Sequence, residues 1–293
     1  MTTITANVIC DSINSSDIRL TTLELEYPRF IHAELLTHRV FSRNSASSRA
    51  IPVKRLIESV QTNPAMPIHW GKNQPGMQAN EECNNMIQIT DDHLGEMHGL
   101  TMIDREHAWL KARDKAVEFA KAYSESGYHK QIVNRLLEPF AHIRVVVSST
   151  FWDNFFQLRY HKDAQPEIYE LAKQIKEKLH QSTPTKIKYG QWHLPYITPE
   201  EKQKYDYNIL KKISVARCAS VSYKTVDGQE MTPEKALNIY DKLYISKPFH
   251  ASPFEHVATP NDYLYEEEVS SNFHDSWVQW RKILEVNNDN EIY

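Results

Sequence analysis

Glycine is scarce in this sequence: the 293 residues include only seven, about a third of the roughly 7% that is usual. Neither G-x-G-x-x-G nor G-x-x-x-x-G-K-[ST] occurs, which excludes the glycine-rich loops that cradle phosphates in dinucleotide-binding and P-loop proteins. Gly71 and Gly76 have the spacing of the second motif, but Met77 and Gln78 follow them. Any phosphate group must therefore be held by side chains or by helix ends.

Cysteines and long apolar runs are also few. Cys10, Cys83 and Cys218 are odd in number and far apart, a pattern that fits neither a metal site nor a disulfide framework. We therefore expect reduced thiols and a cytoplasmic protein. The first residues lack the features of a signal peptide, and no run approaches the roughly 18 apolar residues of a membrane span.

Positive charge is not in excess either. The 34 lysines and arginines face 38 aspartates and glutamates, which gives a formal net charge of −4. General nucleic-acid binders are usually basic, so we expect no nucleic-acid partner. We expect no membrane partner because the sequence lacks an apolar run long enough to span a membrane.

The sequence does contain a mixture of strand and helix patterns. Alternation predicts strands at 4–10 and at 20–27, the second ended by Pro28, whereas 144–152 is compatible with a strand or a buried helix. Residues 40–50 are predicted as a polar loop and 61–96 as an irregular excursion. Helices are predicted at 30–39, 52–60, 100–126, 130–137, 163–181, 198–215, 232–247 and 273–284, the sixth opened by a capping box at Thr198–Glu201. We expect an α+β fold: one compact domain over 1–293, with a mainly antiparallel sheet packed by long helices.

Arginines and hydroxyl groups gather at 37–49, just beyond a predicted helix end. Arg39, Arg43 and Arg49 alternate there with four serines. A guanidinium group can donate to two phosphate oxygens at once, and serine hydroxyls add further donors. The segment is therefore interpreted as an anion cradle for a phosphorylated small molecule, with a solvated basic loop as the alternative.

Two further segments carry side chains with possible chemistry. Asn154 and Arg159 flank a run of bulky apolar residues, where a charged group needs either a ligand or an ion-pair partner such as Glu167 or Glu170. His250–His256 holds two histidines and a glutamate, but the spacing is not H-E-x-x-H and a proline interrupts any helix. We therefore expect a turn there and no metal site.

Taken together, these segments resemble the flavin-dependent thymidylate synthases. That family's signature is Arg-His-Arg, seven residues and Ser, and here Thr37-His38-Arg39 is followed by seven residues and Ser47. Asn154–Arg159 resembles the family's Asn-Phe-Leu-x-Leu-Arg, 219–223 its Ala-Arg-Val-Ser-Tyr, and 250–256 its His-x-x-Pro-Phe-Glu-His. Pro28, and Arg135 with Pro139, match further positions of the family more loosely.

The order of the segments differs from that of the family, in which the last two come first. We interpret the difference as a circular permutation, which a fold tolerates when its original termini lie close together at the surface. The permutation predicts that the strand at 20–27 lies beside residues 256–265. It also predicts that Ser222 and His250 face the same cavity as His38 and Arg39, within one subunit or across an interface.

Four positions depart from the family's pattern, one of them near Asp163, where the family has a histidine and His161 lies nearby. Thr37 replaces the first arginine of the signature, Glu34 replaces a glutamine, and Ser45 replaces an acidic residue. Glu34 and Thr37 fall where the family contacts its nucleotide, so the identity of the base is less constrained than the fold.

The resemblance implies transfer of a one-carbon unit from methylenetetrahydrofolate to C5 of dUMP, giving dTMP, with FAD reduced by NADPH. It also implies a homotetramer with sites shared between subunits. Arg159 would be catalytic, stabilising a uracil deprotonated at N3. The implied substrate residues are Glu34, Ser47, Ser48, Arg49, Arg135 and Arg159. The implied flavin residues are His38, Arg39, Ser45, Ser148, Asn154, Ser222, His250, Ser252 and Glu255.

Ser47 is interpreted as a binding residue and not as a nucleophile, because the sequence places no base beside it. Two other functions stay open. One is a flavin-dependent hydroxymethylase acting on dUMP or dCMP, which the changes at Glu34, Thr37 and Ser45 allow. The other is a non-catalytic RNA-binding protein that uses the serine- and arginine-rich loop, which the negative net charge disfavours.

Overall fold

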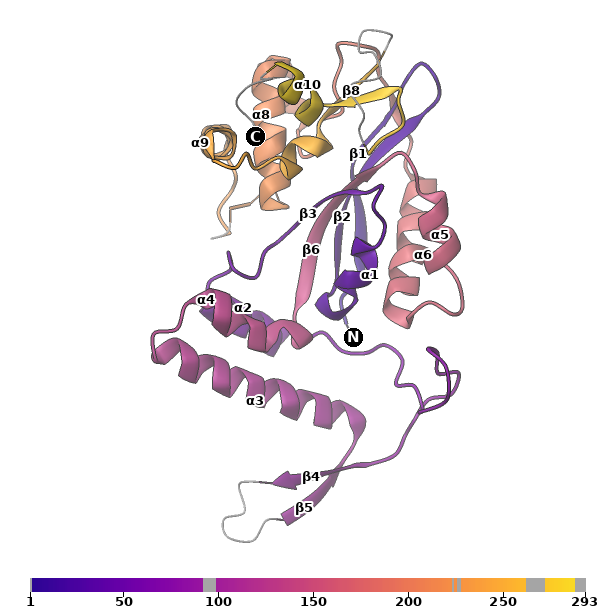
Figure 1. Ribbon diagram of the computed structural model, residues 1–293, viewed down its shortest axis with the longest axis vertical. Helices are drawn as coiled ribbons and strands as arrows, with labels where there is room; N and C mark the ends of the chain where they lie inside the picture. The colour runs from indigo at the N-terminus through magenta and orange to yellow at the C-terminus, as the bar shows by residue number, and fades with distance from the viewer. Residues whose placement is uncertain (1, 92–98, 223, 226–227, 262–271, 288–293) are drawn as a thin grey trace.

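A five-stranded sheet runs through the middle of the computed structural model, which describes residues 2–91, 99–222, 224–225, 228–261 and 272–287 (Figure 1). The strand order is β3-β6-β2-β1-β7, and all neighbours are antiparallel except β1 and β7. The strands are β1 (Thr5–Ile13), β2 (Arg19–Pro28), β3 (Ser42–Ser45), β6 (His142–Ser149) and β7 (Thr185–Lys186). The expected mainly antiparallel α+β fold is confirmed.

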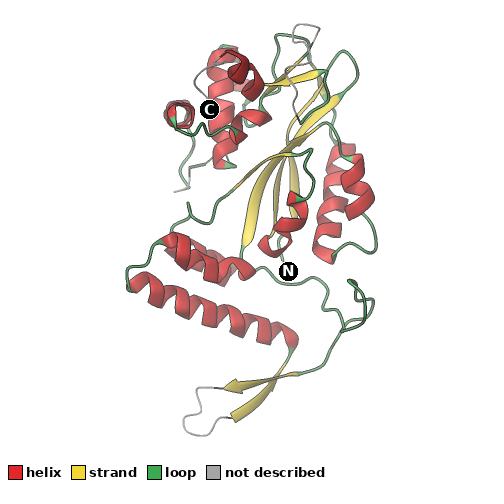
Figure 2. Ribbon diagram, in the orientation of Figure 1, coloured by secondary structure: helices red, strands yellow, loops and turns green. Residues whose placement is uncertain are grey.

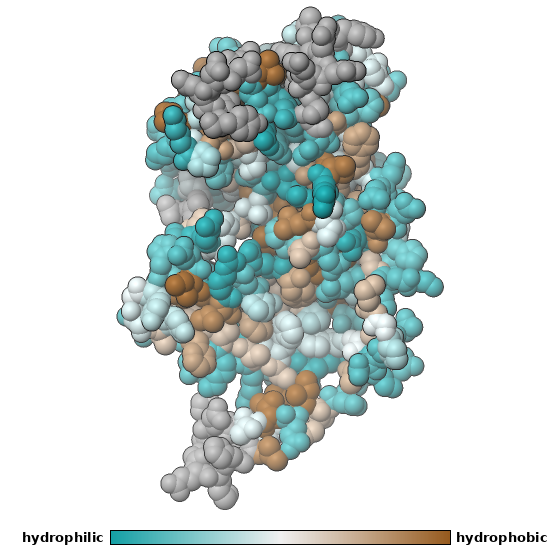
Figure 3. Space-filling model, viewed as in Figure 1, coloured by the Kyte–Doolittle hydropathy of each residue, from teal (hydrophilic) through white to brown (hydrophobic). Residues whose placement is uncertain are grey.

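Two short strand pairs lie outside this sheet. They are β4 (Ile87–Asp91) with β5 (Gly99–Ile103), and β8 (Ala258–Pro260) with β9 (Trp277–Gln279). Leu100 and Met102 of β5 are exposed, and Figure 3 shows apolar side chains among polar ones at that end of the molecule.

Helices cover the sheet and extend beyond it (Figure 2). None of those in the described residues combines the length and the apolar character that crossing a membrane would require. The α-helices are α1 (His32–Leu36), α2 (Val53–Thr62), α3 (Arg105–Glu125), α4 (Lys130–Val133), α5 (Asp153–Arg159), α6 (Pro166–Gln181), α7 (Pro199–Lys204), α8 (Tyr207–Ser220), α9 (Pro233–Ile245) and α10 (Trp280–Asn287). The 3₁₀ helices are η1 (Arg29–Ile31), η3 (Asn134–Phe140) and η4 (Ser252–His256).

Strand β6 explains how the sheet is buried. Val145 and Val147 join the core that contains α6, whereas Val146 packs with Cys218 and Val221 at the end of α8. Successive side chains of a strand point to opposite faces, so a strand covered on both faces is apolar throughout. That is why the sequence at 144–152 did not distinguish a strand from a buried helix.

Local signals predicted several element ends correctly. Thr198 forms the capping box with Glu201, Thr232 caps α9, and Gly127 follows α3 with a positive φ of 84°. These ends depend on groups within a few residues of one another, which is why the sequence alone specifies them.

Other predicted boundaries were wrong. Residues 40–50 contain strand β3, because backbone hydrogen bonds to β6 do not require apolar side chains. The helix predicted at 198–215 breaks at Asp206, whose carboxylate accepts from the amide of Ile209 and starts α8. Strands β5 and β9 occupy the beginnings of the helices predicted at 100–126 and 273–284.

Two more predicted elements need adjustment. The helix predicted at 130–137 is a single α-turn, α4, followed by the 3₁₀ helix η3, which contains Pro139. The excursion is irregular up to β4 and docks on the N-terminal end of α6, where the amide of Ile68 donates to Glu167 and the side chain of Gln78 to Ala164. Residues 92–96 of the excursion lie outside the described residues.

The permutation prediction is confirmed in part. Leu20 of β2 and Ala258 belong to the same cluster of buried apolar side chains, as expected for neighbouring segments. However, β8 pairs with β9 and not with β2, and residues 262–265 lie outside the described part of the chain.

A chain of buried polar groups joins the two ends of the sequence. Ser12 contacts Nδ1 of His193 at 2.9 Å, and Nε2 of His193 contacts the hydroxyl of Thr22 at 2.7 Å. Thr22 contacts Ser148 at 2.5 Å, and Ser148 contacts Nδ1 of His256 at 2.8 Å. Burial lowers the pKa of both histidines to about 3, so both are neutral at pH 7.

We predict that stability falls as the pH drops below about 6.5. The unfolded histidines bind protons near their ordinary pKa whereas the folded ones do not, so each lowers the free energy of unfolding by about 1.4 kcal/mol per pH unit. Denaturant titrations between pH 6.5 and 5 should show a shallower pH dependence for His193→Gln than for the unmodified chain. An equal slope in the two proteins would contradict a neutral, buried His193.

Candidate functional site

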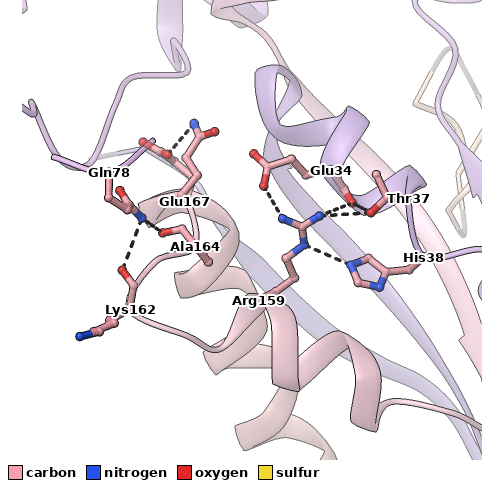
Figure 4. A network of polar contacts seen from close by, with 9 residues as sticks. Glu34, Thr37, His38, Gln78, Arg159, Lys162, Ala164 and Glu167 are labelled. Atoms are coloured by element: carbon pink, nitrogen blue, oxygen red, sulfur yellow. Dashed lines mark hydrogen bonds and ion pairs between the residues drawn. The ribbon is translucent and has the colours of Figure 1, made fainter. Parts of the chain in front are cut away.

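The C-terminal ends of α1 and α5 bring together four residues of the family-like motifs: Glu34, Thr37, His38 and Arg159. Glu34, Thr37 and His38 are spaced three and four apart, so they share one face of a helical turn. Arg159 lies four residues beyond the buried Phe155, on the same face of α5. Figure 4 shows its guanidinium directed at Glu34, Thr37 and His38.

The guanidinium of Arg159 is almost fully engaged by these neighbours. Its Nη1 donates to Oε2 of Glu34 at 2.8 Å, and its Nη2 to the Glu34 carbonyl at 3.4 Å and to Thr37 Oγ1 at 3.1 Å. Its Nε donates to Nε2 of His38 at 3.1 Å. The side chains of Arg159 and Glu34 stay 20% and 27% exposed, so the ion pair remains within reach of a ligand.

His38 is neutral in this cluster. Burial, followed by the cations of Arg159 and Arg43, lowers its pKa to about 4, while a hydrogen bond with Asn154 acts in the opposite direction. Because Arg159 can only donate, Nε2 of His38 must accept, and the single ring proton lies on Nδ1. The ring packs edge-on against Phe155, with centroids 5.0 Å apart.

The Arg159 cluster includes His38, which precedes β3 in the chain. A cavity of about 420 Å³ lies at the C-terminal end of β3. It brings the predicted residues Ser45 and Ser47 together with Ser222 and His250, although these come from distant parts of the sequence. The cavity does not include His38 or Arg39, both of which the structure describes, so the four residues do not share it within one copy of the chain. A cavity shared across an interface between copies stays a prediction. Tyr223, the last residue of the 219–223 motif, lies outside the described residues.

Cationic side chains that the motifs did not indicate also line this cavity. They are Arg55 of α2, Arg144 of β6 and Lys224 beyond α8. Arg144 is also paired with Glu26 at 3.1 Å. Each comes from a different element, so no spacing in the sequence links them. With the serine hydroxyls they make a lining suited to an anionic group.

Ser48 and Arg135 meet at a common carboxylate. Ser48 donates to Oε1 of Glu138 at 2.7 Å, and Nη1 of Arg135 contacts the same oxygen at 2.9 Å. Arg29 is 3.1 Å from that oxygen. Ser48 is buried, whereas the side chain of Arg135 is 56% exposed.

The remaining predicted residues are spread around these two regions. Ser148 is buried in the chain of polar groups between the two histidines, Glu255 is paired with Arg281, and Ser252 begins η4. Arg39 and Arg49 are exposed on the surface. A second cavity, of about 370 Å³, lies between the excursion and α6 and includes Glu167 but none of the substrate or flavin residues that the family resemblance implies.

Neither a clustered metal site nor a disulfide is found in the described part of the chain. No group of three or more histidine, cysteine, aspartate or glutamate side chains lies close enough to hold a metal ion there. Cys10, Cys83 and Cys218 are free thiols, and burial raises the pKa of Cys218 well above its ordinary value.

Comparison with known protein families finds one match. The family model described as "thymidylate synthase complementing protein" matches residues 19–185, more than half of the chain. The 219–223 and 250–256 segments lie beyond the matched residues, as their displaced order requires. No curated protein matches the sequence.

Two examples represent the solved structures that are similar to this chain. Both are of a UMP/dUMP methylase, PolB, from Streptomyces cacaoi, one bound with 5-Br UMP and the other with 5-Br dUMP. The first is 16% identical, with a TM-score of 0.46 over 62% of this chain and 90% of that chain. The second is 14% identical, with a TM-score of 0.42 over 62% and 91%.

We predict that Arg159→Ala raises the pKa of His38 by roughly one unit, because the substitution removes a cation that opposes protonation of the ring. Titration of the histidine ring signals by NMR measures the shift. Arg144→Ala, a loss of the same charge at the cavity, serves as the control and should leave His38 unchanged. An unaltered pKa in Arg159→Ala would refute the contact.

Proposed function

The chain belongs to the family of thymidylate synthase complementing proteins, and from that membership we propose that it is a flavin-dependent enzyme that transfers a one-carbon unit to C5 of a pyrimidine deoxynucleotide. In the form that the family resemblance implies, dUMP and methylenetetrahydrofolate give dTMP, and NADPH reduces the FAD. Reduced FAD would supply the electrons for this chemistry. The protein would bind, orient and polarise the substrates.

The observation that carries the proposal is the cavity at the end of β3. It unites the signature loop, through Ser45 and Ser47, with Ser222 and His250 of the displaced segments. Three cations and several hydroxyls in one cavity fit the diphosphate of a dinucleotide, which cannot be bound here by a glycine-rich loop. The volume is within the usual range for ligand sites.

We propose that the cluster at Arg159 receives the pyrimidine base. The guanidinium would donate a hydrogen bond to the base, and neutral His38 holds that guanidinium in place through Nε2. Ser47, Ser48, Arg49 and Arg135 would hold the nucleotide phosphate and sugar. Because Ser48 and Arg135 already meet at Glu138, they are oriented before a ligand arrives.

We assign the flavin to the cavity residues and to the residues beside the base. Ser45, Ser222 and His250 line the cavity itself, while His38, Arg39 and Asn154 lie before β3 or on α5. We also propose that Ser148, Ser252 and Glu255 support the flavin site from the segments behind it.

The wider organisation is part of the proposal. We propose a homotetramer in which sites are shared between copies, one domain over 1–293, and a cytoplasmic location. Shared sites would explain why the cluster at Arg159 and the cavity lie at opposite ends of β3 within one copy.

The second candidate function is a hydroxymethylase acting on dUMP or dCMP. The Glu34–Arg159 ion pair favours the dCMP form of this candidate, because a compensated guanidinium is less suited to a uracil anion than a free one.

The flavin assignment predicts that Arg55→Ala weakens FAD binding by about tenfold or more, the cost of one charge-assisted hydrogen bond. The change in flavin absorbance on titration of the purified chain measures the affinity. Lys115→Ala, which removes an exposed cation on α3, should leave it unchanged. A chain that binds no FAD would refute the proposed function, and an Arg55→Ala variant of full affinity would refute the assignment of the cavity.

A further inference from the structure

The Glu34–Arg159 pair presents an acceptor next to a donor. Of the five N–H groups of Arg159, one goes to His38, one to Oε2 of Glu34, and two to the Glu34 carbonyl and Thr37. Within the described part of the chain, the remaining N–H on Nη1 and the Oε1 of Glu34 have no hydrogen-bond partner. A ligand therefore meets one carboxylate acceptor beside one guanidinium donor.

The charge of the pair matters as much as its hydrogen bonds. The Glu34 carboxylate, 2.8 Å from Nη1, compensates the positive charge of Arg159. Thr37, which accepts from Nη2, adds no second cation. Burial also raises the pKa of Glu34, against the opposing effect of Arg159. The cluster is thus close to neutral overall, and a base that must become an anion gains little from it.

Cytosine and uracil differ on the edge that this pair would meet. Cytosine offers the N4 amino group as a donor beside N3 as an acceptor, and carboxylates commonly accept from that amino group. Uracil offers an acceptor, O4, where cytosine has the amino group. Uracil can reach both groups only with its N3–H directed at Oε1 of Glu34, a contact that favours the protonated base and opposes formation of the N3 anion.

We infer that Glu34 is a specificity-determining residue and that, through its pairing with Arg159, it selects a 4-aminopyrimidine nucleotide such as dCMP over dUMP. The inference rests on the proposed function, which places the base at Arg159. A site that binds a donor group through a partly buried acceptor, such as Glu34, discriminates against an analogue without that donor, because its own polar group would lose water and be left unpaired. Glu34 would then determine which base the enzyme binds, while the class of reaction stays the same.

Isothermal titration of dCMP and dUMP into the FAD-loaded chain tests this inference. We expect dCMP to bind at least about tenfold more tightly than dUMP, because one specific hydrogen-bonded contact to a base edge gives discrimination of about this size. Glu34→Gln replaces the carboxylate by a neutral amide that can donate to O4 and frees the charge of Arg159. The substitution should weaken the binding of dCMP and strengthen the binding of dUMP, and so remove or reverse the preference for dCMP.

Glu118→Gln is the matched control: it makes the same chemical change on an exposed part of α3 and should keep the preference. A preference for dUMP in the unmodified chain, or a preference for dCMP that Glu34→Gln leaves intact, would overturn the role of Glu34 while the proposed function stands. If the FAD-loaded chain binds neither nucleotide, the proposed function itself fails, and the inference fails with it.

Discussion

The pairing of β3 with β6 is the constraint on which the rest of the site depends. Four polar residues, Ser42–Ser45, are held as the edge of the sheet by hydrogen bonds to a strand that is apolar on both faces. The chain before β3 is thereby brought to Arg159, and the chain after it to the cavity with Ser222 and His250. One short edge strand thus fixes the spacing between the proposed base site and the proposed flavin site.

Charge compensation distinguishes the two ends of β3. At one end the guanidinium of Arg159 is matched by Glu34, and His38 stays neutral because burial and nearby cations oppose its protonation. At the other end Arg55, Arg144 and Lys224 surround hydroxyl groups. A nearly neutral region suits a base, and a cationic region suits phosphate. This division agrees with the proposed nucleotide enzyme and with the proposed change in its recognition of the base.

Much of the fold could be predicted from the sequence because its signals are local. The capping box at Thr198 and the glycine after α3 were read from neighbouring residues. Strand β3 was missed because only its partner β6 makes it a strand, and Arg55 and Lys224 were missed because they meet only in the folded chain. The motifs did identify Glu34, His38 and Arg159, but the ion pair that joins two of them depends on how α1 and α5 pack.

The central claim is that this protein transfers a one-carbon unit to a pyrimidine base whose identity is determined by Glu34 and Arg159. Mass spectrometry of the products tests it most directly, with dCMP and dUMP supplied together to the FAD-loaded chain, NADPH and methylenetetrahydrofolate. The account predicts that dCMP gains a methyl or hydroxymethyl group at C5 at least about tenfold faster than dUMP. Product formed only from dUMP, or no product from either nucleotide, would contradict it.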